Sequence, residues 1–291
     1  MNSRYIGRLF FVVPVFMMGC AVLSHSQLKT IHTFASAAEK YPVFPGDVVK
    51  RAQELHFNNN ILEASALGDS GLAMPSLRKA IAEYDTGIAY ARRMNVSLHL
   101  IERYAALLAQ LSSDSYYSDF GENTKDLCGT LGSAVDSFNA RMAPQLPPSI
   151  GAVLVQVIKI AGTGIIRVKQ TKALRKIIPA GDTIIQTIKN DLAGVFNGDL
   201  KQLLDIYRQN FESDFQLIIL ANPARIQYSS LHMYAATTAD FTAVELLRQK
   251  CLRIISKMAA AHQEIRESLA KKENLKEMFG ATKDFVSDAT Q

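Results

Sequence analysis

Residues 77–108 read LRKAIAEYDTGIAYARRMNVSLHLIERYAALL, and this stretch decides the fold class. Apolar side chains recur in it every three or four residues, which is the period of an α-helix. The pattern persists for about nine turns, so at 1.5 Å per residue it predicts a helix roughly 50 Å long. Such a helix is a rod, since helices of soluble proteins average about 11 residues. The recurring positions are Leu77, Ile81, Tyr84, Ile88, Ala91, Met94, Leu98, Ile101, Ala105 and Leu108.

The same periodicity extends along the chain on both sides of this stretch. Helices are predicted for residues 46–67, 124–142 and 182–221, with Asp182 as an N-cap after a turn at Pro179. Long helices bury their apolar seams against one another. The sequence therefore predicts an all-α protein, an elongated antiparallel bundle of four to five long helices. The seam of its last helix is Val244, Leu247, Cys251, Ile254, Met258, Ala261, Ile265 and Leu269.

Residues 149–168, SIGAVLVQVIKIAGTGIIRV, are apolar on every side apart from Gln156 and Lys159. A helix of this kind is normally buried by its neighbours. The β-branched runs around the Gly162–Gly164 loop also fit a small β-hairpin. A third interpretation is a membrane-active segment, because an apolar hairpin between very long helices resembles the layout of α-helical pore-forming toxins. The residues that would enter the bilayer are Val153, Val155, Val157, Ile158, Ile160, Ile165 and Ile166.

The first twenty residues have the features of an export signal. Arg4 and Arg8 precede the apolar run 9–18, which is too short to span a membrane, and Gly19 and Cys20 follow it. A small residue and a cysteine after such a run resemble the precursors of bacterial lipoproteins. The resemblance implies that Cys20 is lipid-modified after cleavage. Since Ala21 rather than Asp follows, it also implies an outer-membrane protein facing the periplasm.

These features divide the chain into three parts. Residues 1–19 are predicted as a lipoprotein signal peptide, residues 20–45 as a lipid-anchored tether with a short helix, and residues 46–291 as a single helical-bundle domain. Cys128 and Cys251 then lie in an oxidising compartment, where a disulfide bond between them is permitted. Two buried free thiols are the alternative.

The composition and the motif content exclude several functional classes. The chain has 291 residues, 48% of them hydrophobic and 20% charged, which excludes a disordered protein. Its formal charge of +5 combines a basic stretch between Lys159 and Lys189 with an acidic one between Ser112 and Asp126, so no nucleic-acid partner is expected. None of the 6 histidines has metal-ligand spacing, and no phosphate-binding loop occurs. The sequence predicts no catalytic, cofactor-binding or metal site.

The functional expectation follows from the predicted export signal and from the predicted rod shape of the bundle. We expect a lipid-anchored envelope protein without enzymatic activity that contacts the membrane through its anchor and a protein partner through its bundle. The alternative is a membrane-active protein that inserts residues 149–168.

Overall fold

The computed structural model describes residues 22–41, 45–66, 71–113, 120–143, 145–162, 165–221, 228–271 and 275–290. Within these ranges the chain forms helices and no strand, which confirms the all-α prediction. The helices are α1 (His25–Glu39), α2 (Pro45–Ala66), α3 (Ala73–Ser112), α4 (Phe120–Arg141), α5 (Ser149–Ala161), α6 (Ile166–Asn197), α7 (Asp199–Ala221), α8 (Tyr228–Lys271) and α9 (Leu275–Ala289).

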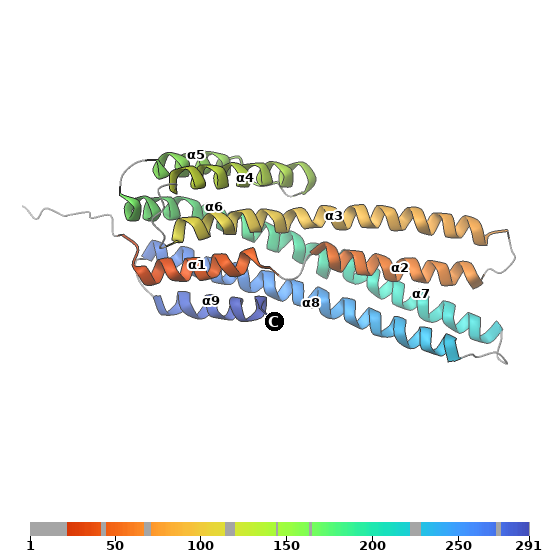
Figure 1. Ribbon diagram of the computed structural model, residues 1–291. Helices are drawn as coiled ribbons and strands as arrows, with labels where there is room; N and C mark the ends of the chain where they lie inside the picture. The colour runs from red at the N-terminus through yellow and green to blue at the C-terminus, as the bar shows by residue number, and fades with distance from the viewer. Residues whose placement is uncertain are drawn as a thin grey trace, which may run out of the picture.

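The helices form two long antiparallel pairs (Figure 1). In one, α1 and α2 follow each other along the molecule and α3, with 40 residues, runs back beside them. In the other, α6 and α7 follow each other and α8, with 44 residues, runs back. At 1.5 Å per residue α8 is about 65 Å long, so the protein is a rod. We call the end where α1 and α6 begin the base, and the end where α3 and α8 begin the tip.

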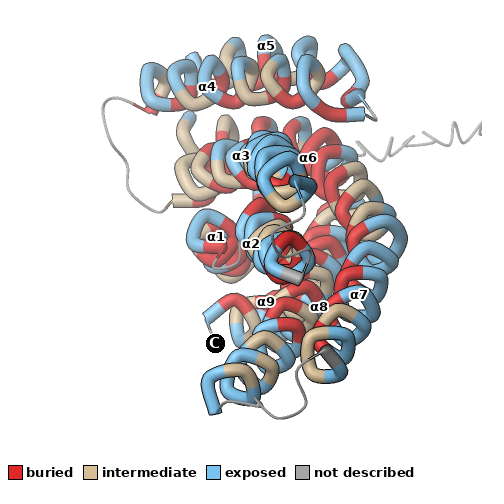
Figure 2. Tube along the Cα trace, turned by 90° about the vertical axis from the view of Figure 1, so that its right-hand side faces the viewer, coloured by how far each residue is buried: buried red, intermediate tan, exposed pale blue. Residues whose placement is uncertain are grey.

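The rod is thicker at the base than at the tip. Around the base, α4 and α5 form a layer over α3 and α6, and α9 covers α1 and α8 (Figures 1 and 2). Toward the tip only α2, α3, α7 and α8 are seen among the described helices. The predicted number of four to five helices is therefore not confirmed, because shorter helices complete the two long pairs.

Helix α1 belongs to the core of the bundle. Leu28, Ile31, Phe34 and Ala35 are at most 1% exposed and pack in the same cluster as the side chains of α3 and α8. A capping box at Ser24 and Gln27 fixes its first turn. The short helix predicted within residues 20–45 is thus present, but the segment 23–41 is packed into the rod and does not hang from it as a tether.

Helix α6 continues through Pro179 and ends at Gly198, so the predicted helix start at Asp182 is wrong. Proline removes one backbone hydrogen bond but does not end a helix that is packed on several neighbours. The C-terminal end of α6 is held by a side chain of α8. Nη1 of the buried Arg248 donates to the carbonyl oxygen of Phe196 at 2.9 Å. Glu245 holds the same guanidinium through its two carboxylate oxygens, at 2.6 and 2.8 Å.

Residues 149–161 form helix α5, so the β-hairpin interpretation is not confirmed. The helix is not buried all round either. Ile150, Leu154, Val157 and Ala161 are buried, and α5 packs on α4 and α6. The opposite side is open, with Val155 51% exposed. A single buried face is enough because α5 lies in the outer layer of the rod (Figure 2).

Candidate functional site

A connected set of polar contacts joins side chains of α3, α6 and α8 inside the bundle. Tyr104 of α3 has its hydroxyl oxygen 2.6 Å from Nε2 of His262 on α8. Nδ1 of His262 is 3.3 Å from Oδ1 of Asp182 on α6, and Oδ2 of the same carboxylate is 2.8 Å from Nη1 of Arg266. We call these four residues the core network. It links one ionisable group from each of three helices and a second one from α8.

The protonation states in the core network follow from its surroundings. Burial lowers the pKa of His262 and outweighs the opposing effect of Asp182, so the ring is neutral near pH 7. The hydrogen bond from His262 lowers the pKa of Asp182, as does the charge of Arg266. Burial holds the pKa of Tyr104 well above its usual value. The tyrosine hydroxyl therefore donates to Nε2, and Nδ1–H donates to the ionised carboxylate.

The inner part of the core network, Tyr104 and His262, is closed to substrates, whereas the Arg266 side chain at its outer end is 42% exposed. Tyr104 and His262 are 1% and 0% exposed, and Phe34 lies against the imidazole at a ring-centroid distance of 5.5 Å. On the α6 side Gly181 lies so close to the Tyr104 ring that a methyl group would overlap it. A nucleophile or base must reach its substrate, and these groups contact only other protein groups. The arrangement can fix the register of three helices.

Acidification is expected to destabilise the rod through His262. The unfolded chain takes up a proton near the ordinary pKa of 6.5, whereas the folded chain does so only at lower pH, since the pKa of His262 is lowered. The contribution of His262 to the free energy of unfolding is therefore fully present above about pH 6.5 and is lost as the pH falls below it. His56 is shifted in the same direction by burial. Urea unfolding from about pH 7 to about pH 5 should therefore show a smaller loss for His262→Phe than for wild type.

That comparison removes the titration of His262 and, with it, the hydrogen bond that lowers the pKa of Asp182, while the other titrating residues are common to the two proteins. A loss of stability that is the same with and without His262 would contradict the expectation.

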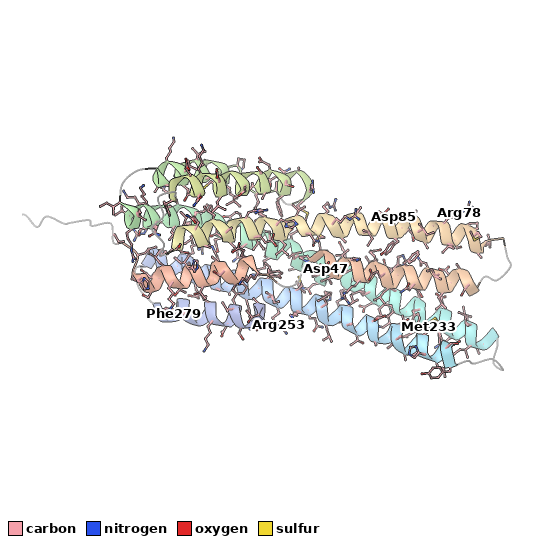
Figure 3. The ribbon with its side chains drawn as sticks, viewed as in Figure 1. Asp47, Arg78, Asp85, Met233, Arg253 and Phe279 are labelled. Atoms are coloured by element: carbon pink, nitrogen blue, oxygen red, sulfur yellow. The ribbon has the colours of Figure 1, made fainter. Side chains whose placement is uncertain are left out.

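Exposed apolar side chains gather at the tip. They come from the first turns of α3 and α8 and the last turns of α7, and the largest exposed fractions are 82% for Tyr228 and 74% for Leu220. Figure 3 shows Arg78 and Met233 toward this end of the rod. We call this set the tip patch: Leu72, Met74, Leu217, Leu220, Tyr228, Leu231 and Met233.

The residues of the predicted membrane-active segment do not share one exposed surface. Val155 and Ile165 are exposed, and Val157 is buried. The others, half-buried, are Val153, Ile158, Ile160 and Ile166. Across the described ranges, no helix combines the length and the apolar character that crossing a membrane requires.

Cys128 and Cys251 are both buried free thiols in the structure, which is the second of the two states that the sequence left open. The reason is the layering of the bundle. Cys128 lies on α4, which packs on α3 and α5, whereas Cys251 lies on α8 near α1, where the Tyr41 hydroxyl donates to its carbonyl oxygen at 3.1 Å. Burial raises the pKa of Cys128 to about 11 and that of Cys251 to about 12. Both thiols are therefore protonated and unreactive near neutral pH.

The sequence argument missed the core network because its bonded members are separated by up to 158 residues and lie in no motif. Asp182 had been interpreted as an N-cap, and Tyr104 lies within the stretch 77–108 that was interpreted only as a helix. A usable signal existed in Gly181, since a glycine inside a helical pattern often marks a close approach of another group.

The predicted signal peptide and Cys20 lie outside the described residues. Within the described ranges, His, Cys, Asp and Glu form no group of three or more that could hold a metal ion. Comparison of the chain with protein-family models, with curated proteins and with solved structures finds no match.

Proposed function

We propose that this protein is a lipid-anchored rod of the cell envelope that acts through contact with another protein, and that the tip patch makes this contact. One observation carries the proposal. The described chain begins at the base, and the tip patch lies at the opposite end of helices about 65 Å long. A protein anchored through Cys20 would present this patch far from its own membrane, facing the periplasm if the anchor is in the outer membrane.

The composition of the tip favours a protein partner over a lipid surface. Exposed apolar patches on soluble proteins commonly mark interaction sites, and protein interfaces combine an apolar centre with a polar rim. Charges of both signs flank the patch: Glu63 and Asp214 near the ends of α2 and α7, and Arg78 and Lys79 in the second turn of α3. A mixed rim fits a protein surface better than a uniformly charged bilayer.

The same features make enzymatic activity an unattractive proposal. Tyr104 and His262 of the core network are buried, and the tip patch offers apolar area without a converging set of titratable groups. No cofactor is required for a role based on contacts.

The alternative function, insertion of residues 149–168 into a membrane, would require α5 to leave α4 and α6. Ile150, Leu154, Val157 and Ala161 would then lose their buried positions. Each large aliphatic side chain among them contributes about 1.5–3 kcal/mol when buried. This cost, which a membrane would have to offset, counts against the alternative.

The test has two arms, one for the anchor and one for the tip. If Cys20 is lipid-modified, wild type is expected to be labelled by radioactive palmitate and to be found with the membranes. The Cys20→Ala variant is expected to be unlabelled and released from the membranes. The tip predicts that a photoreactive amino acid at Leu220 crosslinks the protein in cells to one discrete partner. The matched control is Leu246, which is 61% exposed on α8 between the two ends and is expected to give no such product.

An unlabelled, soluble wild type would refute the anchor. Equal crosslinking from Leu220 and Leu246 would refute a specific role for the tip patch.

A further inference from the structure

The base of the rod is tied closely to the start of the described chain. The backbone N–H of Leu23 donates to the Thr171 side-chain oxygen at 3.0 Å, in a buried hydrogen bond between segments 148 residues apart. Leu23 itself is 4% exposed. Thr171 lies in the second turn of α6. The N-terminal segment is therefore fixed to the first turns of α6 and not only to its own helix.

This attachment limits how far the base can be from an anchor at Cys20. Cys20 precedes Leu23 by three residues, and three residues span at most about 11 Å. That reach is about the diameter of one helix with its side chains. If Cys20 carries acyl chains, the beginning of α6 lies at the level of the lipid headgroups.

The outer face of α6 at this end carries apolar and basic side chains in one stripe. Ile165, Lys169, Lys172 and Lys176 follow one another at intervals of four, three and four residues, so they lie on one side of the helix. Ile165 is 75% exposed, and Lys172 and Lys176 are exposed. Lys159, in the last turn of α5, is exposed on the helix that packs against α6. We call Ile165, Lys169, Lys172 and Lys176 the α6 stripe.

We propose that the α6 stripe binds the anionic headgroups of phospholipids and holds the base of the rod against the membrane. Basic side chains are attracted to anionic bilayers, and an exposed isoleucine beside them can enter the headgroup region. The inference rests on the proposed anchor, which brings the stripe to the bilayer. It goes beyond that anchor because it gives the surface of the folded protein a lipid-binding role of its own.

The charges around the stripe are compatible with this role. Two exposed acids, Glu122 and Asp126, lie on α4, which packs on α3 and α5. The α6 stripe itself carries three lysines and no acid.

The test uses the chain from Val22 to the C-terminus, which contains every contact described above and lacks Cys20. Its sedimentation is compared with vesicles of phosphatidylcholine alone and of phosphatidylcholine mixed with phosphatidylglycerol. We expect binding to the mixed vesicles only, weakened by salt. The triple variant Lys169→Glu/Lys172→Glu/Lys176→Glu should lose at least about tenfold in apparent affinity.

A control variant carries the same change of charge away from the base. Lys50→Glu/Arg78→Glu/Lys79→Glu alters three exposed bases on α2 and α3, and it is expected to bind within about twofold of wild type. Circular dichroism verifies that both variants are folded. Failure of the wild-type chain to bind mixed vesicles, or equal losses in the two variants, would overturn the proposal.

The same vesicles, loaded with dye, distinguish docking from insertion. Docking predicts that the dye is retained, and its release would overturn docking in favour of insertion. Because the tested chain lacks Cys20, the result is independent of palmitate labelling, and failure of the anchor and failure of the stripe are separate outcomes.

Discussion

Gly181→Ala is expected to lower the stability of the rod by about 3 kcal/mol, which corresponds to a decrease of roughly 10 °C in Tm. A Cβ atom at this position would overlap the ring of Tyr104. The ring cannot move aside easily, because it is 1% exposed and its hydroxyl is bonded to His262. Either α6 must shift away from α3 or the core network must break. Thermal unfolding followed by circular dichroism measures the effect.

Gly194→Ala is the matched control on the same helix. A methyl group there would meet nothing within 4 Å, and alanine is favoured over glycine inside a helix by up to about 1 kcal/mol. Its Tm should be unchanged or higher. A second control removes the obstacle, since Gly181→Ala combined with Tyr104→Leu should cost less than the sum of the two single changes. Equal Tm values for the two alanine variants would show that α6 and α3 are not in contact at Gly181.

The periodicity of the sequence was sufficient to predict the all-α class and the long helix over residues 77–108, but not how deeply each part of that helix is buried. In the stretch 77–108, positions from Ala91 onward are buried as predicted, whereas Ile81 is 46% exposed and Leu77 is half-buried. The spacing is the same in both halves. The difference arises because the tip has fewer neighbouring helices to cover the seam, and the number of neighbours is a property of the assembled bundle.

Proline was a misleading signal at two places. Residues 20–45 were predicted as a tether with a short helix that the prolines at 42 and 45 would end, but α2 begins at Pro45 itself. Pro179 suggested a turn, but α6 passes through it because its buried face continues on both sides, from Leu174 to Ile184 and beyond. The free energy by which a proline locally disfavours the helix is smaller than the packing free energy that a continuous helix preserves.

The core network could not be predicted from any local pattern. Asp182 and His262 are 80 residues apart, and Tyr104 and His262 are 158 residues apart. Each residue looked ordinary in its own helix, and only the packing of α3, α6 and α8 makes them partners. The tip patch is similar, because its members come from three helix ends that the fold brings to the same end of the rod.

Asp182→Ala is expected to cost about 1–3 kcal/mol, the range for leaving a buried hydrogen-bonding group without its partner. The carboxylate accepts the Nδ1–H of His262 at 3.3 Å and pairs with Arg266 at 2.8 Å. Without it, the imidazole N–H has no acceptor in a position with 0% exposure, and a buried polar group without a partner is strongly destabilising. Urea unfolding should show a lower midpoint with an unchanged slope.

Two further variants separate this explanation from a general loss of charge. Glu102→Ala removes the partner of His99 in an exposed pair with an N–O distance of 2.9 Å, and such pairs contribute at most about 1 kcal/mol. Asp182→Ala combined with His262→Phe removes both polar partners and fills the space of the ring, so its cost should be clearly smaller than the sum of the two single changes. If the double variant were as unstable as that sum, Asp182 and His262 would act independently. The three helices would then have to be held in register by apolar packing alone.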